Sequence, residues 1–337
     1  MGHVLTTIDA HVAGEPLRLI TGGLPRLVGK TMAQKRDWMK RHADHLRRAV
    51  VLEPRGHRDM CAACLTEPVS PGSDAGVVFL QHDGYSAISG HAIMAIATIA
   101  LERGLFFSRE ATSDARLTFD TVAGTVYAHA RAQSRGGRCR VDSVAFTNVP
   151  SFVLRGGHAV RIGSRDLRVD LAFGGVFYAI VDTEAVGVPL TAARLPDLRR
   201  LGAEIRAALN ATGAVVHPAA SDSSGVEGVI FTGPAHDPEA HLRNITIIGD
   251  GAADRSPCAT GTSAVMAVLD AMGLLEEGRP FVHEGVLGTL HRGRVVGRTQ
   301  AGELPAIVTE IEGTAWITGD HTFHVDDDDP LKDGYAI

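Results

Sequence analysis

Two stretches of this 337-residue chain decide its fold: "DGYSAISGHAIMAIATIALERG" (83–104) and "ADRSPCATGTSAVMAVLDAMG" (253–273). Each begins with a polar turn that carries a small nucleophile-type side chain, Ser89 in the first and Cys258 in the second. Each continues as an Ala-rich run that is apolar on nearly every side, which predicts a buried helix. The duplication therefore predicts two similar lobes, each with a sheet wrapped around a central helix.

Short runs rich in Val, Ile, Phe and Thr predict the strands of these sheets. They occur at residues 48–54, 75–80, 116–130, 140–150, 169–182, 225–233 and 242–250. Further helices are expected near 29–48 and 191–210. The pattern indicates a β-rich α/β fold rather than a regular βαβ alternation. We expect one lobe over 1–150, completed by 320–337, a second over 151–319, and a linker around 146–168.

Composition excludes several classes of function. The chain has 33 basic and 39 acidic residues, a net charge of -6, which gives no support for nucleic-acid binding. No run of about 18 apolar residues predicts a membrane span. Four cysteines argue against a disulfide scaffold, so we expect a cytoplasmic protein. Cys61 and Cys64 could form a redox or zinc half-site, but no second pair accompanies them, and two buried thiols are the favoured interpretation. No metal site is predicted.

The two turns suggest acid–base chemistry. A helix N-terminus can hold a carboxylate and can lower the pKa of a nearby thiol. Two such termini acting on one anionic group would suit removal of the α-proton of a carboxylate-bearing substrate, with Cys258 as the base. Ser89 has no evident activating base in the sequence and is expected to donate a proton or a hydrogen bond. The alternative is that Cys258 is a structural thiol and Ser89 a turn residue.

A set of blocks spread in order over nearly the whole chain resembles the proline racemase family. The blocks are "DAHVAGEPLRLI" (9–20), "GKTMAQKRDW" (29–38), "LEPRGHRDM" (52–60), "LTEP" (65–68), "GYSAISGH" (84–91), "AFGGVFYAIVD" (172–182), "DRSPCATGTSA" (254–264) and "HTFHVDDDDPLKDGY" (321–335). The family contains proline racemases, 4-hydroxyproline 2-epimerases and trans-3-hydroxy-L-proline dehydratases. The resemblance implies a diaminopimelate-epimerase-like fold of two pseudo-symmetric lobes, an active site in the cleft between them, and no cofactor.

The resemblance also implies roles for individual residues. Cys258 matches the second catalytic cysteine of the family, and Ser89 stands where racemases and epimerases usually carry the first. His91 and Asp254 match residues that line the pocket and contact the ring nitrogen. The backbone groups that match the carboxylate cradle belong to Gly90, His91, Ala259 and Thr260. Ala259 replaces a usual glycine, which changes little because only its N–H group is needed.

Ser89 bears on which reaction is expected. A racemase needs an acid–base group on each face of the substrate, whereas a single residue can serve the syn loss of water from trans-3-hydroxy-L-proline, whose α-hydrogen and 3-hydroxyl share a ring face. Family dehydratases often keep the first cysteine and replace the second, usually by Thr, which is the reverse of this chain. The Ser/Cys arrangement resembles members with both dehydratase and 2-epimerase activity.

We therefore predict dehydration of trans-3-hydroxy-L-proline to Δ1-pyrroline-2-carboxylate through the Δ2 enamine. The alternative is 2-epimerisation of trans-4-hydroxy-L-proline to cis-4-hydroxy-D-proline, also as a second activity of the same site. A non-catalytic amino-acid-binding protein on the same fold is a third hypothesis. The expected partner is the small-molecule substrate hydroxyproline, and a homodimer is left open.

Overall fold

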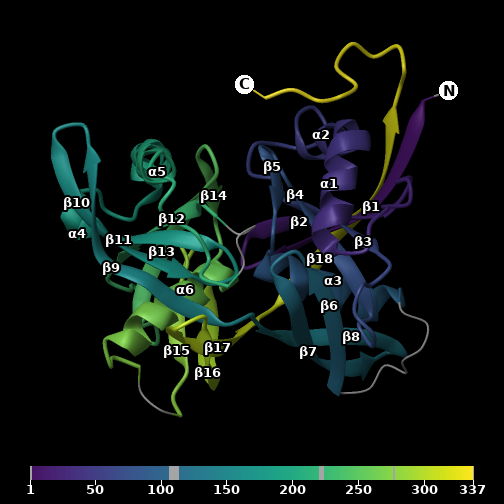
Figure 1. Ribbon diagram of the computed structural model, residues 1–337. Coiled ribbons are helices and arrows are strands. Elements are labelled where there is room, and N and C mark those ends of the chain that lie inside the picture. Colours follow the sequence, from purple (N-terminus) through teal and green to yellow (C-terminus); the bar gives the residue numbers. More distant parts are fainter. Residues whose placement is uncertain (1, 106–113, 220–223, 276–277, 337) are drawn as a thin grey trace. The chain divides into compact units, whose positions relative to one another are not determined.

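The computed structural model describes residues 2–105, 114–219, 224–275 and 278–336. The chain divides into two compact units (Figure 1). The first comprises Met1–Phe146 and Thr314–Ile337, and the second comprises Thr147–Gly313. The sequence-based lobes were drawn a few residues later, with the first boundary after residue 150 and the second after residue 319.

The first unit is a curved sheet packed against one buried helix. The hydrogen-bonded order of its strands is β18 (Ala315–Val325), β1 (His3–Val12), β2 (Glu15–Gly22), β3 (Ala62–Thr66), β4 (Ala75–Gln81), β6 (Asp114–Thr121) and β7 (Gly124–Arg135). The short strand β5 (Gly84–Ser86) pairs with β4, and β8 (Arg138–Thr147) follows β7. Because β18 pairs with β1, the C-terminal segment completes this unit.

The central helix of this unit is α3 (Gly90–Arg103), which contacts β1, β2, β7 and β18. All its residues from Gly90 to Ala100 are buried, as the apolar run predicts. The helix ends where Gly104 adopts a left-handed conformation, with φ of 66°, which glycine accepts without steric cost. The expectation of a sheet around a central helix is confirmed here.

Two helices on the other side of the sheet differ from the expected single helix near 29–48 and from the expected strand at 48–54. The region near 29–48 forms α1 (Met32–His42) and α2 (Asp44–Val51), which meet at Ala43. The predicted strand at 48–54 is therefore wrong, because its first half is the end of α2. Short apolar runs do not distinguish strand from buried helix. Here Leu46 and Val50, four residues apart, bury one helical face against the core that includes Val78 of β4.

The second unit is a closed barrel around a helix (Figure 1). Its strands pair in a ring, so that the last pairs again with the first: β13 (Leu242–Ile248), β12 (Val226–Gly233), β11 (Phe177–Asp182), β10 (Arg165–Phe173), β9 (Ser151–Ile162), β17 (Leu304–Gly313), β16 (Leu290–Ala301) and β15 (Phe281–Glu284). The short strand β14 (Ala252–Asp254) pairs with β13. The helix α6 (Ala259–Ala271) contacts β9, β10, β11, β16 and β17, and its residues Ala259–Ala267 are buried.

The expected linker around 146–168 is wrong. Residues Ser151–Ile162 form β9, an integral strand of the barrel, and the division between the units lies at Thr147. The glycines and arginines in this stretch favour a loop, but they belong to β9. The strand carries such residues because only part of it faces the core. The predicted strand 169–182 is two strands, β10 and β11, separated at Gly174–Val176.

The expected helix near 191–210 is confirmed. It consists of the short 3₁₀ turn η1 (Ala192–Arg194) and α5 (Leu195–Asn210), which packs against β12 and β13, and it follows α4 (Thr183–Val186). Among the described residues, no helix is long and apolar enough to cross a membrane.

Candidate functional site

Cys258 lies at the N-terminus of α6, directly before its first turn. Its backbone has φ of 59°, a left-handed value that costs energy for a residue with a Cβ. The side chain is 3 % exposed, and its Sγ lies 3.8 Å from both the Tyr178 hydroxyl and Thr260 Oγ1. The unusual backbone therefore holds a buried thiol among hydrogen-bonding groups, which is the kind of strained position found at functional sites.

Asp254 and Ser256 hold the turn that leads into Cys258. Asp254 Oδ1 accepts hydrogen bonds from the Ser256 backbone N–H (2.8 Å) and from Ser256 Oγ (2.7 Å). Ser256 Oγ in turn accepts the backbone N–H of Cys258 at 3.0 Å. Asp254 is 2 % exposed. Through Ser256, its carboxylate therefore holds the backbone of Cys258 in place, a connection that the sequence did not indicate.

Two glycines let the chain approach this thiol closely. A Cβ at Gly261, in the first turn of α6, would lie 2.9 Å from Cys258 Sγ, and one at Gly174 would lie 2.1 Å from the carbonyl oxygen of Thr260. Neither position has room for a side chain. The Gly174–Val176 turn between β10 and β11 thus fixes the first turn of α6 from outside the helix.

Burial raises the pKa of the Cys258 thiol above its ordinary value, and the nearby Asp254 carboxylate raises it further. The Gly261 backbone N–H and the Tyr178 hydroxyl, both able to donate to an ionised sulfur, lower the pKa and so act in the opposite direction. The resting side chain is accordingly a protonated thiol. It can give a proton as it stands, and it must ionise before it can take one.

A buried network supports the same turn from behind. Thr262 Oγ1 donates to the carbonyl of Pro257 at 3.0 Å and lies 2.9 Å from His283 Nδ1. Asn244 Nδ2 donates to the same carbonyl at 3.0 Å and lies 2.8 Å from His283 Nε2. His283 is fully buried, and burial together with nearby His291 lowers its pKa to about 3. A neutral imidazole therefore helps to position the carbonyl that precedes Cys258.

Ser89 occupies the equivalent place before α3 in the first unit. Its side chain makes no capping bond to its own helix, and its Oγ lies 3.2 Å from His91 Nδ1. Ser89 and His91 are 7 % and 8 % exposed. The expectation that Ser89 has no activating base is therefore corrected, because the His91 imidazole lies within hydrogen-bonding distance and can accept its proton in the tautomer whose Nδ1 carries no hydrogen. The Ser-Gly-His sequence at residues 89–91 could have indicated this contact.

The four expected backbone positions lie in the first turns of the two helices. Gly90 and His91 begin α3, and Ala259 and Thr260 begin α6. First-turn N–H groups are the ones that a helix does not use in its own hydrogen bonds, so they can bind an anion. The structure thus brings Ser89, Gly90 and His91 together in one unit, and Asp254, Cys258, Ala259 and Thr260 together in the other.

Sequence reasoning missed Tyr178, Ser256, Asn244, Thr262 and His283. Ser256 could have been found, because a Ser side chain commonly accepts the backbone N–H two residues further on in turns such as the one before this helix. The others lie on distant strands or inside the helix, and nothing in their local sequence distinguishes them from core residues.

The Cys61–Cys64 pair is not placed as a redox or metal site. Both thiols are buried and outside any disulfide, and burial raises the pKa of Cys64 to about 12. A thiol with so high a pKa is unreactive at neutral pH. The favoured interpretation of two core thiols is confirmed for these described side chains.

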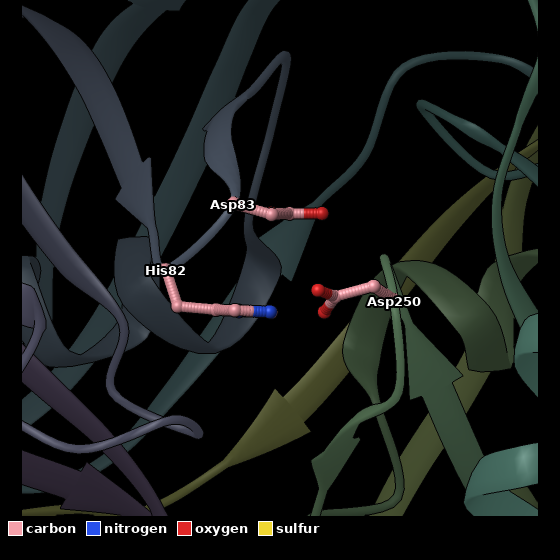
Figure 2. A group of neighbouring side chains, drawn as sticks. All are labelled: His82, Asp83 and Asp250. Atoms are coloured by element: carbon pink, nitrogen blue, oxygen red, sulfur yellow. The ribbon is translucent and has the colours of Figure 1, made fainter. Parts of the chain in front are cut away.

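Figure 2 shows three polar residues on turns: His82 and Asp83 between β4 and β5, and Asp250 between β13 and β14. The first two belong to the first unit and Asp250 to the second. Among the described residues of each unit taken by itself, no three His, Cys, Asp or Glu side chains are placed to share a metal ion.

Known proteins resemble this chain over nearly its whole length. Residues 7–336 match the family model described as "Proline racemase". The chain is 40 % identical to a trans-3-hydroxy-L-proline dehydratase of Bacillus cereus over 335 residues, 99 % of this chain and 98 % of the relative. It is 38 % identical to a 3-hydroxyproline 2-epimerase of Burkholderia multivorans over 334 residues, with the same coverage of both chains.

A solved structure of a hydroxyproline epimerase from Agrobacterium vitis, with bound trans-4-hydroxy-L-proline, superposes with a TM-score of 0.91. The two chains are 32 % identical, and the match covers 99 % of this chain and 95 % of that one. The α/β fold expected from the sequence is confirmed by this similarity. The named relatives comprise a lyase and isomerases, and both kinds of enzyme use hydroxyproline. The chain belongs to the proline racemase family.

Proposed function

We propose that this protein dehydrates trans-3-hydroxy-L-proline to Δ1-pyrroline-2-carboxylate by way of the Δ2 enamine. The observation that carries the proposal is the unequal pair of side chains before α3 and α6: a Ser89–His91 contact in one unit and a buried Cys258 thiol in the other. A relative at 40 % identity named trans-3-hydroxy-L-proline dehydratase supports the same reaction. The low cysteine content of the chain supports a cytoplasmic location as part of this proposal.

Cys258 is the proposed acid–base group. Once ionised, its sulfur takes the α-proton of the substrate and becomes a thiol. The same thiol then gives that proton to the 3-hydroxyl, which leaves as water, so the thiolate is regenerated and no other reactant is consumed. One residue can do both because the α-hydrogen and the 3-hydroxyl lie on one ring face.

The other site residues have supporting roles in this proposal. The first-turn N–H groups of both helices, at Gly90, His91, Ala259 and Thr260, bind the substrate carboxylate and stabilise the negative charge that develops on it as the α-proton leaves. The Asp254 carboxylate lies near the cationic ring amine and keeps it protonated.

A second activity, 2-epimerisation of hydroxyproline, is favoured by the Ser89–His91 contact. Epimerisation requires a second group to return a proton to the opposite ring face. A serine hydroxyl that gives its proton to the substrate α-carbon and regains one from His91 meets this requirement better than an isolated serine, and relatives named 3-hydroxyproline 2-epimerase and hydroxyproline epimerase support it. Trans-4-hydroxy-L-proline, which has no 3-hydroxyl to lose, would show this activity alone.

The test is a product assay on the purified protein. Trans-3-hydroxy-L-proline should be converted to a cyclic imine. Borohydride reduces this imine to proline, and amino-acid analysis quantifies the proline. Trans-4-hydroxy-L-proline should give cis-4-hydroxy-D-proline more slowly. Absence of proline after reduction, with epimer formed from either substrate, would replace the dehydratase proposal by the epimerase. No change in either substrate would favour a binding protein.

A further inference from the structure

The hydroxyl of Tyr178 is placed between two polar atoms at the start of α6. Tyr178 belongs to β11 and is 2 % exposed. Its oxygen lies 2.7 Å from Thr260 Oγ1 and 3.8 Å from Cys258 Sγ, and the last two atoms are themselves 3.8 Å apart. The three atoms form a triangle in which the single phenolic proton can point to either neighbour.

The surroundings keep this phenol protonated and therefore able to donate. Burial raises the pKa of Tyr178 well above its ordinary value, and the nearness of Cys258 and Glu227 raises it further. Among the described residues, the carboxylates that raise these two pKa values are those of Asp254, beside Cys258, and of Glu227 in β12, beside Tyr178. Neither stabilises a negative charge on sulfur. Hydrogen bonds from uncharged donors, such as the Tyr178 hydroxyl, can stabilise that charge.

We propose that the Tyr178 hydroxyl is a switching hydrogen-bond donor, which points to Thr260 Oγ1 while Cys258 is a thiol and turns to Cys258 Sγ when the thiol loses its proton. The short 2.7 Å contact favours Thr260 in the resting state, because oxygen is a better acceptor than a neutral thiol. A thiolate reverses that preference, since hydrogen bonds to charged acceptors are roughly twice as strong as those to neutral ones. The turn is a rotation about the phenolic C–O bond and requires no movement of the strand.

This inference deepens the proposed function and rests on it for its meaning, because it explains how a buried thiol next to Asp254 could ionise during turnover. It also assigns a task to Thr260 beyond its backbone N–H: its hydroxyl holds the donor ready when the sulfur does not need it. The alternative is that Tyr178 only fills space beneath α6.

The experiment measures the reactivity of the thiol without substrate. Iodoacetamide alkylates thiolates, so the rate of Cys258 modification, followed by peptide mass spectrometry from neutral to alkaline pH, reports the ionised fraction. Tyr178→Phe removes only the hydroxyl and should lower the rate at a given pH by about tenfold, the loss of one charge-assisted hydrogen bond of about 1.4 kcal/mol. Tyr127→Phe, at an exposed tyrosine of the other unit, should leave the rate unchanged.

A second variant keeps the proposal testable if Tyr178→Phe does not fold. Replacing Tyr178 by 3-fluorotyrosine keeps the hydroxyl and makes it a stronger donor, so the alkylation rate should rise. Unchanged rates in a folded Tyr178→Phe variant, or in the fluorinated protein, would overturn the proposal. Because alkylation needs no turnover, the outcomes separate: a protein that fails to dehydrate hydroxyproline can still show the tyrosine effect, and a dehydratase can lack it.

Discussion

Ser89 Oγ lies 3.2 Å from His91 Nδ1, so the serine that replaces a family cysteine has an imidazole within hydrogen-bonding distance. The contact changes what the replacement means. A serine alone is a weak proton donor and a very weak base, whereas a serine that shares its proton with histidine can take part in proton transfer. In the proposed reaction, Ser89 and Cys258 therefore act as two acid–base groups of different strength.

The first prediction concerns this inequality. Ser89→Cys should raise the rate of hydroxyproline 2-epimerisation by about tenfold or more. The pKa of a thiol is far closer to the working pH than that of a serine hydroxyl, so a thiol exchanges protons more readily. Chiral chromatography of trans-4-hydroxy-L-proline reactions measures it. Ser86→Cys is the matched control, since Ser86 is also buried and lies three residues away but bonds to the Ile88 carbonyl. An equal gain in both variants would remove position 89 from the site.

The second prediction concerns Cys258. Cys258→Ala should reduce both elimination and α-proton exchange by about 10²–10⁴-fold, the usual contribution of a positioned acid–base group. Steady-state rates with trans-3-hydroxy-L-proline measure the loss. Cys61→Ala, at another buried thiol, should retain the activity of the parent protein within a small factor. Substantial turnover by the Cys258→Ala variant would mean that another residue removes the proton.

Much of this arrangement could be predicted from the sequence, because it is encoded locally. The two Ala-rich runs gave both central helices, and the turns before them gave Ser89 and Cys258 at the two N-termini. The end of α2 was taken for a strand, since a short run such as Ala49–Val51 fits either structure until its packing partner is known. The expected linker likewise became β9, a strand that pairs with both neighbours in the barrel.

The remaining site residues could not be predicted, because they depend on contacts between distant segments. Tyr178 reaches Thr260 over 82 positions, and Asn244 reaches His283 over 39. Tyr178, Asn244 and His283 lie in strands that are buried along nearly their whole length, so nothing in the local pattern marks them out. Only the closing of the barrel around α6 brings these side chains to the turn before Cys258.

The third prediction tests the packing of that turn. Gly174→Ala would place a methyl group 2.1 Å from the Thr260 carbonyl oxygen, so the first turn of α6 must move. We expect a loss of about 1–3 kcal/mol in the free energy of unfolding, typical of overpacking, together with a fall in kcat. Denaturant titration and steady-state kinetics measure the two effects. Gly156→Ala, where the nearest atom is Asp170 Oδ1 at 3.7 Å, serves as control and should change neither quantity appreciably.

The fourth prediction concerns pH and stability. Burial lowers the pKa of His283 from 6.5 to about 3, so on acidification the unfolded chain takes up a proton before the folded one does. His283 therefore contributes stability that is present above pH 6.5 and is lost as the pH falls from 6.5 towards about 3. The loss amounts to about 1.4 kcal/mol per pH unit within that window.

Urea titrations at several pH values measure this dependence. His283→Asn retains polar atoms facing Asn244 and Thr262 but does not titrate. The slope of the unfolding free energy against pH should therefore fall by the amount that corresponds to the uptake of about one proton on unfolding. His324→Asn, at an exposed histidine, should leave the slope unchanged. A His283→Asn slope equal to that of the parent protein would show that His283 is not the residue responsible.

The most direct measurement for the central claim is a proton NMR time course of the parent protein with trans-3-hydroxy-L-proline in D2O. Removal of the α-proton by Cys258 followed by loss of the 3-hydroxyl predicts that the α-proton and 3-proton signals of the substrate disappear together as signals of the cyclic imine appear. Loss of the α-proton signal no faster than in an enzyme-free sample would contradict the claim. Exchange of that proton for deuterium without formation of the imine would assign the protein to epimerisation alone.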